Sequence, residues 1–192
     1  MTDPDEIGRA IAVIAAALDE LAVRWAIGGS VASATHGEPR ATNDVDVVAH
    51  LDEASARALA ARIGTDFYVD LDAALDAVRR RSSFNVIDNR SFIKFDVFVP
   101  ARGPMGTGQL DRAIRLEIFP GAGPIPVLGP EDTILQKLYW YRLGGEVSDR
   151  QWRDVVGVVR TARAFLDEDY LSQVAKDADL GELLEKARRG AS

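Results

Sequence analysis

The chain has 192 residues, of which 47% are hydrophobic, and a formal net charge of −7. The absence of cysteine excludes disulfides and zinc–thiolate sites, and the acidic charge argues against a long DNA-binding track, because nucleic-acid affinity depends on Lys and Arg contacting phosphates. The apolar run at residues 10–18 is too short to span a bilayer, and acidic residues precede it where a signal peptide needs positive charge. We therefore expect a cytoplasmic protein with no membrane partner.

The first elements end in a glycine turn. Apolar residues at three- and four-residue steps from Ile7 to Leu21 predict a helix, and a short strand is expected at residues 23–27. Gly28-Gly29-Ser30 follows, and a second helix is expected to begin at Ser30. Glycines allow close approach of the backbone to a ligand, and a helix start favours an anion. Gly29 and Ser30 are therefore candidate phosphate-binding residues.

A pair of carboxylates comes next along the chain. Thirteen residues, 31–43, separate Ser30 from Asp44-Val45-Asp46. In a strand, alternate side chains share a face, so Asp44 and Asp46 are expected to project together. Mg²⁺ prefers one or two carboxylates plus substrate phosphates, which makes this pair a candidate metal site. Arg40 and Thr42, just before the pair, are candidates for contacting the phosphates, although this segment is equally compatible with an exposed loop.

The middle of the chain predicts alternating helices and strands. We expect a helix from Asp52 to about residue 63, a strand at 67–69, a helix at 71–81, and strands at 84–87 and 92–99 joined by a hairpin turn. Asp70-Leu71-Asp72 repeats the spacing of the carboxylate pair but precedes a helix, so helix capping explains it better. Arg79-Arg80-Arg81 is the densest basic run, and its position at a helix end favours a solvated face over an RNA contact.

A third carboxylate lies in the last of these strands. Ile93, Phe95, Val97 and Val99 alternate with Lys94 and Asp96, so the two charged side chains are expected on the face opposite the apolar one. Asp96 is the candidate for completing a two-metal site or for taking a proton from an attacking hydroxyl. Lys94 is a candidate for balancing charge there or contacting phosphate.

The C-terminal third is predicted to be helical. Strands are expected at residues 116–119 and 125–128 as an edge hairpin of a mixed sheet, and a helix is expected from Pro130 to Gly144-Gly145. Ser148-Asp149-Arg150-Gln151 has the pattern of a capping box for a further helix. We therefore expect an α/β (α+β) core at residues 1–128, with a mixed β-sheet flanked by helices, and a helical C-terminal extension at residues 129–192.

The combined motif resembles the nucleotidyltransferase superfamily typified by DNA polymerase beta, whose signature is a Gly-Gly/Ser turn, a gap of this length, Asp-x-Asp and a later single acid. Within it the chain looks most like the small bacterial minimal nucleotidyltransferases and AbiEii-like toxins. Lys94-Phe95-Asp96 is similar to that branch's Lys-x-Asp element. That branch also has a downstream Lys on a helix, followed by a helix that bears an Asp, and Lys137 and Asp154 look similar to these two residues. Solvent exposure of Lys137 and a surface ion pair of Asp154 with Arg150 are the alternatives.

The resemblance implies a nucleotidyltransferase fold and an Mg²⁺-dependent enzyme, with two ions expected, that moves a nucleoside monophosphate from an NTP to an acceptor hydroxyl. Asp44, Asp46 and Asp96 would bind the metal. The acceptor is left open between tRNA, a protein and a small molecule, and a cognate antitoxin or toxin is a possible partner. The alternatives are an antibiotic-type small-molecule nucleotidyltransferase, which the acidic charge would suit because cationic drugs seek acidic clefts, and a non-catalytic antitoxin or binding subunit with the same fold.

Overall fold

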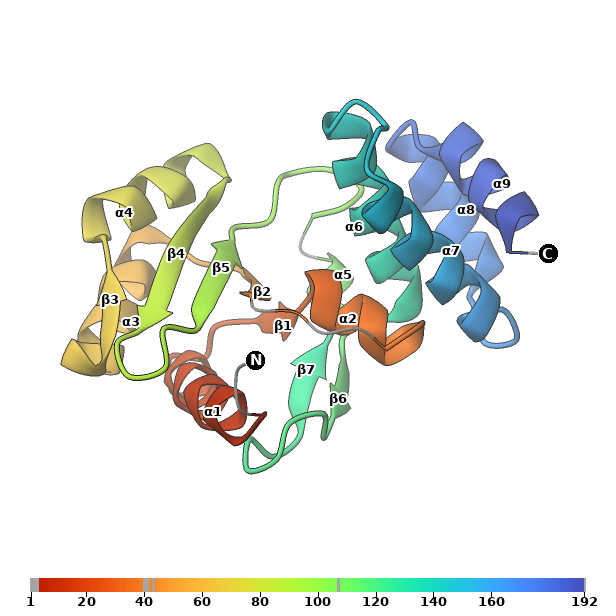
Figure 1. The fold of residues 1–192 in the computed structure, drawn as a ribbon. Coiled ribbons are helices and arrows are strands. Elements are labelled where there is room, and N and C mark those ends of the chain that lie inside the picture. The colour runs from red at the N-terminus through yellow and green to blue at the C-terminus, as the bar shows by residue number, and fades with distance from the viewer. Residues whose placement is uncertain (1–3, 40–41, 43, 107, 192) are drawn as a thin grey trace.

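A computed structural model of the protein describes residues 4–39, 42, 44–106 and 108–191, and it contains a mixed β-sheet with helices around it (Figure 1). Within these residues seven strands pair in the order β3-β4-β5-β2-β1-β7-β6. The strands are β1 (Trp25–Ile27), β2 (Asp44–Ala49), β3 (Phe67–Val69), β4 (Ser83–Asp88), β5 (Lys94–Phe98), β6 (Ile114–Leu116) and β7 (Ile125–Val127). β2 pairs in parallel with β5 and antiparallel with β1, so the predicted mixed sheet is confirmed.

The helices fall into a group around the sheet and a group at the C-terminal end. The first group is α1 (Pro4–Glu20), α2 (Gly29–His36), α3 (Glu53–Ile63), α4 (Leu71–Arg80) and the short α5 (Gly108–Asp111). The second group is α6 (Pro130–Leu143), α7 (Asp149–Ala162), α8 (Glu168–Asp177) and α9 (Gly181–Gly190). In Figure 1 the second group lies at the opposite end of the molecule from α3 and α4.

Local chemistry sets several of these helix boundaries as predicted. The side chain of Asp52 accepts a hydrogen bond from the backbone N–H of Ser55 at the start of α3. Asp70 caps α4 in the same way through the N–H of Ala73, which confirms that Asp70-Leu71-Asp72 is a capping sequence. Pro130 occupies the first turn of α6, where a backbone N–H would have no acceptor within the helix, so the missing N–H of proline costs no hydrogen bond.

Strand alternation separates an apolar face of the sheet from a polar one. Val45 and Val47 of β2 and Phe95 and Val97 of β5 are buried in one hydrophobic cluster with residues of α1, α3 and α4. The alternate side chains of the same strands point the other way, as the pattern predicted. Burial of the apolar face therefore fixes which face of β2 and β5 carries the carboxylates.

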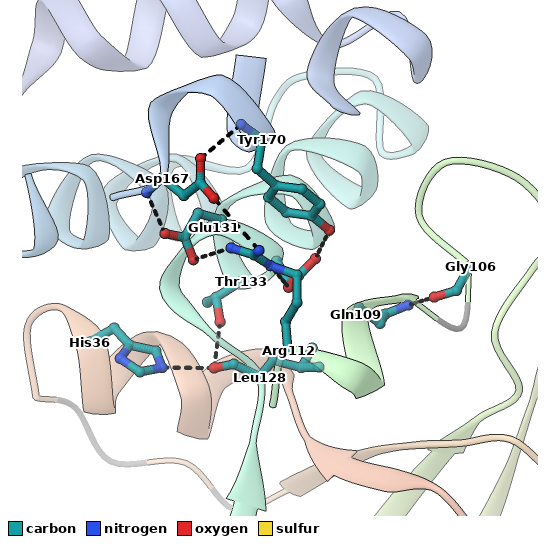
Figure 2. Close-up of polar contacts among 10 residues, drawn as sticks. His36, Gly106, Gln109, Arg112, Leu128, Glu131, Thr133, Asp167 and Tyr170 are labelled. Carbon is teal, nitrogen blue, oxygen red and sulfur yellow. Dashed lines mark hydrogen bonds and ion pairs between the residues drawn. The ribbon is translucent and has the colours of Figure 1, made fainter. Parts of the chain in front are cut away.

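A second hydrophobic cluster, formed by residues 134–187, lies among α6, α7, α8 and α9. Arg112 links this group to the core (Figure 2): its guanidinium stacks 3.8 Å from the ring centroid of Tyr170 and approaches Glu131, Asp132 and Asp167 at 3.6–3.7 Å. The division at residues 128/129 into two units stays a prediction.

Differences from the predicted elements lie at the edge of the sheet. The edge strand β6 begins at Ile114, two residues before the predicted strand at 116–119. Of the two strands of this hairpin only β6 lies at an edge of the sheet, since β7 also pairs with β1. The register of β6 against β7 decides this boundary, and such long-range pairing leaves little mark in local sequence. In the described parts of the chain, every helix is too short or too polar to cross a membrane.

Candidate active site

The polar face of the sheet carries three rows of cross-strand partners from β2, β5 and β4. The rows are Asp44, Lys94 and Ile87; Asp46, Asp96 and Asn85; and Val48, Phe98 and Ser83. We call the row of Asp46, Asp96 and Asn85 the central row, and the row of Val48, Phe98 and Ser83 the third row. Directly opposite side chains on paired strands lie side by side, so the three strands place Asp46 beside Asp96, although the two residues are 50 positions apart in the sequence.

The glycine turn lies against the central row. The side chain of Asp46 accepts a hydrogen bond of 3.2 Å from the backbone N–H of Ser30 at the start of α2. Gly29 has φ +55°, and a Cβ atom on Gly29 would overlap the Asp46 carboxylate. Glycine is therefore required at this position both for its backbone conformation and for the close approach of Asp46.

The N–H groups of this turn are engaged within the protein. Gly29 donates to the side-chain oxygen of Gln136 on α6 at 3.1 Å, as Ser30 donates to Asp46. Gln136 thus ties α6 to the turn. Gln136 was not predicted from the sequence, because an amide in a helix has no local pattern that marks its distant partner.

Lys94 neutralises part of the carboxylate charge. Its Nζ lies 2.8 Å from Oδ2 of Asp96 and 3.9 Å from Oδ2 of Asp44. The hydrogen bond to Asp96 raises the pKa of Lys94, so the ammonium group stays protonated at neutral pH. Lys94, Asp96 and Asp44 are thus brought together as the sequence pattern predicted.

Asp46 is subject to opposing influences on its pKa. Burial raises its pKa, the hydrogen bond from Ser30 opposes this shift, and the charge of Asp96 raises the pKa further. Among the described residues, no three His, Cys, Asp or Glu side chains are arranged to hold a metal ion, and the ammonium group of Lys94 pairs with one of the three predicted ligands. Metal binding by Asp44, Asp46 and Asp96 stays a prediction.

Lys137 on α6 and Asp154 on α7 form a buried ion pair. Their side chains are 5% and 9% exposed, and Nζ lies 2.8 Å from Oδ2. The alternative interpretations, an exposed Lys137 and a surface pair between Asp154 and Arg150, are wrong, because α6 and α7 pack face to face and enclose both charges. The charge of Lys137 also lowers the pKa of Asp46, so this pair is electrostatically coupled to the central row.

The remaining predicted residues contribute less to the geometry. The hydroxyl of Thr42 donates to the backbone oxygen of Asp44 at 3.1 Å, so it supports the start of β2. Arg40 lies outside the described residues. In the basic run, Arg79 pairs with Glu53 and Arg80 with Asp76, both at 2.9 Å, as expected of a solvated face.

Comparison with solved structures identifies the fold. An antigenic nucleotidyltransferase-like protein from Paracoccidioides brasiliensis matches with a TM-score of 0.55 at 19% identity, covering 99% of this chain and 94% of that one. The solution structure of the antibiotic-resistance factor ANT(2'')-Ia matches with a TM-score of 0.58 at 17% identity, and its crystal structure with adenylyl-2''-tobramycin with 0.54 at 16%. Each covers 96% of this chain and 97% of its own. No protein-family model and no curated protein sequence matches the chain. The predicted nucleotidyltransferase fold is confirmed.

Proposed function

We propose that the protein is an Mg²⁺-dependent nucleotidyltransferase that moves a nucleoside monophosphate from an NTP to an acceptor hydroxyl. The observation that carries this proposal is the position of Asp46, which is the cross-strand partner of Asp96 and accepts a hydrogen bond from Ser30 at the start of α2. Three segments far apart in sequence thereby bring two carboxylates and a helix start to one place. Structures of the same fold include the antibiotic-resistance factor ANT(2'')-Ia, which supports this class of reaction.

The proposed metal ligands are of the type that a hard divalent cation prefers. Asp44, Asp46 and Asp96 offer carboxylate oxygens on one face of the sheet, and the charge of Asp96 raises the pKa of Asp46. These three side chains would hold Mg²⁺, two ions in the fully loaded site, after Lys94 releases Asp96. When bound, Mg²⁺ would neutralise the triphosphate and the charge that develops on the transferred phosphoryl group.

The glycine turn would orient the NTP. The positive end of the α2 dipole and the Ser30 hydroxyl would face the β- and γ-phosphates, since a helix N-terminus favours anions. The buried charge of Lys137 would add to the positive potential on this side of Asp46. Arg40, Thr42 and Lys94 remain proposed phosphate contacts, and Asp154 would act by holding Lys137 in place.

The chemical step is an in-line displacement. The acceptor oxygen forms a bond to the α-phosphorus, the bond from that phosphorus to the bridging oxygen of the β-phosphate breaks, and pyrophosphate leaves with the electron pair. The Asp96 carboxylate takes the proton of the attacking hydroxyl. The products are the nucleotidylated acceptor and pyrophosphate.

Membership of the AbiEii-like branch, a tRNA or protein acceptor and a toxin–antitoxin partner stay predictions. A small-molecule acceptor is favoured by a cavity of about 430 Å³ over the third row, next to the central row, a volume typical of sites for small ligands. A non-catalytic binding subunit would have no need for a glycine turn packed against Asp46 or for two like-charged carboxylates, Asp46 and Asp96, side by side.

The test is NTP binding and transfer by purified protein. Protein is incubated with each α-³²P-labelled NTP, Mg²⁺ and separate pools of small metabolites, tRNA and protein, and the transfer of label is measured alongside the Tm shift caused by Mg²⁺ and NTP. We expect labelling in the small-molecule pool that Asp44→Asn and Asp46→Asn abolish, with circular dichroism unchanged. Asp72→Asn, which removes an exposed carboxylate on α4, is the matched control and retains activity. Transfer at the wild-type rate in both site variants refutes the proposal.

A further inference from the structure

The cavity of about 430 Å³ lies over the third row of the sheet, one side-chain position beyond Asp46 and Asp96. Val48, Phe98 and Ser83 all line it. Residues two apart on a strand are separated by about 7 Å, so a group in this cavity reaches the central row with a short substituent. The cavity is therefore a direct neighbour of the proposed reaction centre.

The position of the cavity distinguishes acceptor from nucleotide. Across the sheet, the order β1, β2, β5, β4 places the glycine turn after β1, Asp46 on β2, Asp96 on β5 and Ser83 on β4. In an in-line displacement the leaving pyrophosphate and the attacking oxygen lie on opposite sides of the phosphorus. If the triphosphate faces the turn, the acceptor approaches from the side of β5 and β4, which is where Phe98 and Ser83 line the cavity.

Aromatic rings form one wall of the cavity. Phe98 and Trp140 contact each other with ring centroids 4.9 Å apart and an interplanar angle of 38°, and both are only partly buried. Tyr139, on the same helix as Trp140, is 40% exposed and also lines the cavity. Partly exposed rings beside a cavity provide faces on which a planar ring can stack.

The charge of the lining is opposite to the charge of the whole chain. Arg81 and Arg102 line the cavity, and none of its described lining residues is Asp or Glu. Within the described chain neither of these arginines forms an ion pair, whereas Arg79 and Arg80 are paired on the surface of α4. The cavity therefore repels a polycation and attracts a carboxylate or another anionic group, although the net charge of −7 by itself would favour a cationic ligand.

We propose that this cavity is the acceptor subsite and that the acceptor is a small hydroxyl-bearing molecule with an aromatic ring and an anionic group, not a polycationic aminoglycoside. The ring stacks on Phe98 and Trp140, the anionic group faces Arg81 and Arg102, and the hydroxyl extends toward Asp96. This assignment rests on the proposed function, since it names the acceptor of the same reaction.

The test measures binding without turnover. Protein labelled with ¹⁵N has three tryptophans, and Trp140→Phe assigns the indole N–H signal of Trp140. Without NTP or Mg²⁺, the protein is titrated with 4-(hydroxymethyl)benzoate, with the matching cation 4-(hydroxymethyl)benzylamine, with the saturated 4-(hydroxymethyl)cyclohexanecarboxylate and with tobramycin. We expect the benzoate to shift the Trp140 signal with a Kd at least about tenfold lower than that of the amine and the saturated acid. Tighter binding of the amine or of tobramycin, or no shift with the benzoate, overturns the proposal.

Matched variants connect this preference to the cavity. In the double variant Arg81→Gln/Arg102→Gln the preference for benzoate over benzylamine should fall to about twofold or less, because the two charges that create it are gone. Arg80→Gln removes a neighbouring arginine that does not line the cavity and should keep the full preference. Phe98→Leu should weaken benzoate binding by about fivefold through loss of ring stacking. An unchanged preference in the double variant overturns the proposal.

A final arm separates an acceptor subsite from a nucleobase subsite. Saturating Mg²⁺ and a non-hydrolysable ATP analogue should leave the Kd of the benzoate within about twofold, because acceptor and nucleotide bind together. Displacement of the benzoate by the analogue would make the cavity a nucleobase site and overturn this assignment while leaving nucleotidyl transfer intact. Failure of the protein to bind or transfer any NTP would instead refute the proposed function, and the titrations without nucleotide would still report on the cavity.

Discussion

Asp46 of β2 and Asp96 of β5 are cross-strand partners in a parallel pair, and both point to the polar face of the sheet. The carboxylates thus share a site that neither strand could form alone. If Asp96 takes the proton of the attacking hydroxyl, Asp96→Asn should lower the transfer rate by about 10²- to 10⁴-fold. Asn85→Ser, at the other end of the central row, is the control and should retain most of the rate. Single-turnover release of pyrophosphate measures both, and equal rates in the two variants would contradict the role of Asp96.

Lys94→Met should strengthen the response of the protein to Mg²⁺. The ammonium group contacts Asp96 and Asp44, so it competes with a cation for the same oxygens. Without metal, its loss should lower the free energy of unfolding by less than about 1 kcal/mol, because the pair is partly exposed. The rise in Tm on adding Mg²⁺ should exceed that of the wild type. A smaller rise than in the wild type would show that Lys94 does not compete with the metal.

Gly29→Ala should be more damaging than the same change at another left-handed glycine. Gly29 and Gly64 have φ values of +55° and +61°, but a Cβ at Gly29 would overlap Asp46, whereas a Cβ at Gly64 meets open space. Backbone strain alone costs about 1–3 kcal/mol, so Gly64→Ala should lose an amount in this range. Gly29→Ala should lose more and should also lose NTP binding. Urea unfolding of both variants tests this, and equal losses would remove the steric role of Asp46.

The buried pair of Lys137 and Asp154 should be costly to break from either side. Lys137→Met or Asp154→Leu leaves one uncompensated buried charge, and we expect each to lower the free energy of unfolding by about 3–5 kcal/mol. The double variant should recover much of this loss in stability, since no charge remains unpaired. Its transfer activity should stay low, because the positive potential near Asp46 is gone. Additive losses in the double-mutant cycle would show that the two side chains act independently.

The network of Figure 2 should make stability depend on pH. Burial raises the pKa of Asp132 to about 6. The hydrogen bond from Tyr170 and the charge of Arg112 oppose this rise, and the charge of Glu131 adds to it. Because this folded-state pKa lies above the unfolded value of 3.8, the stabilising contribution of Asp132 is complete below about pH 3.8 and is lost as pH rises through 6.

The free energy of unfolding of the wild type relative to Asp132→Asn should therefore fall by on the order of 2–3 kcal/mol between pH 4 and pH 7. Denaturant unfolding at a series of pH values measures this difference. Asp72→Asn serves as the control for general charge effects, because its carboxylate lies on the exposed side of α4. A difference that is constant across this range, or that grows with pH, would contradict the assignment.

Much of the local architecture follows from the sequence because it depends on neighbours in the chain. Asp52 and Asp70 cap their helices through N–H groups three residues away, and strand alternation alone puts Lys94 and Asp96 on one face. Long-range partners were not predictable in the same way. Gln136 contacts Gly29 across 107 residues, and nothing near either residue indicates that contact.

The sequence by itself determined that a glycine turn, a carboxylate pair and a third carboxylate occur on strands with a defined polar face, since side-chain period and helix capping act over a few residues. Only the tertiary structure decided that β5 lies beside β2 in the register that joins Asp46 to Asp96, and that α6 and α7 enclose Lys137 with Asp154. It also decided that a chain with a net charge of −7 places two arginines at the cavity next to its carboxylates. The physical reason is that strand order, register and helix packing are set by burial of the whole apolar surface, and no single segment contains that information.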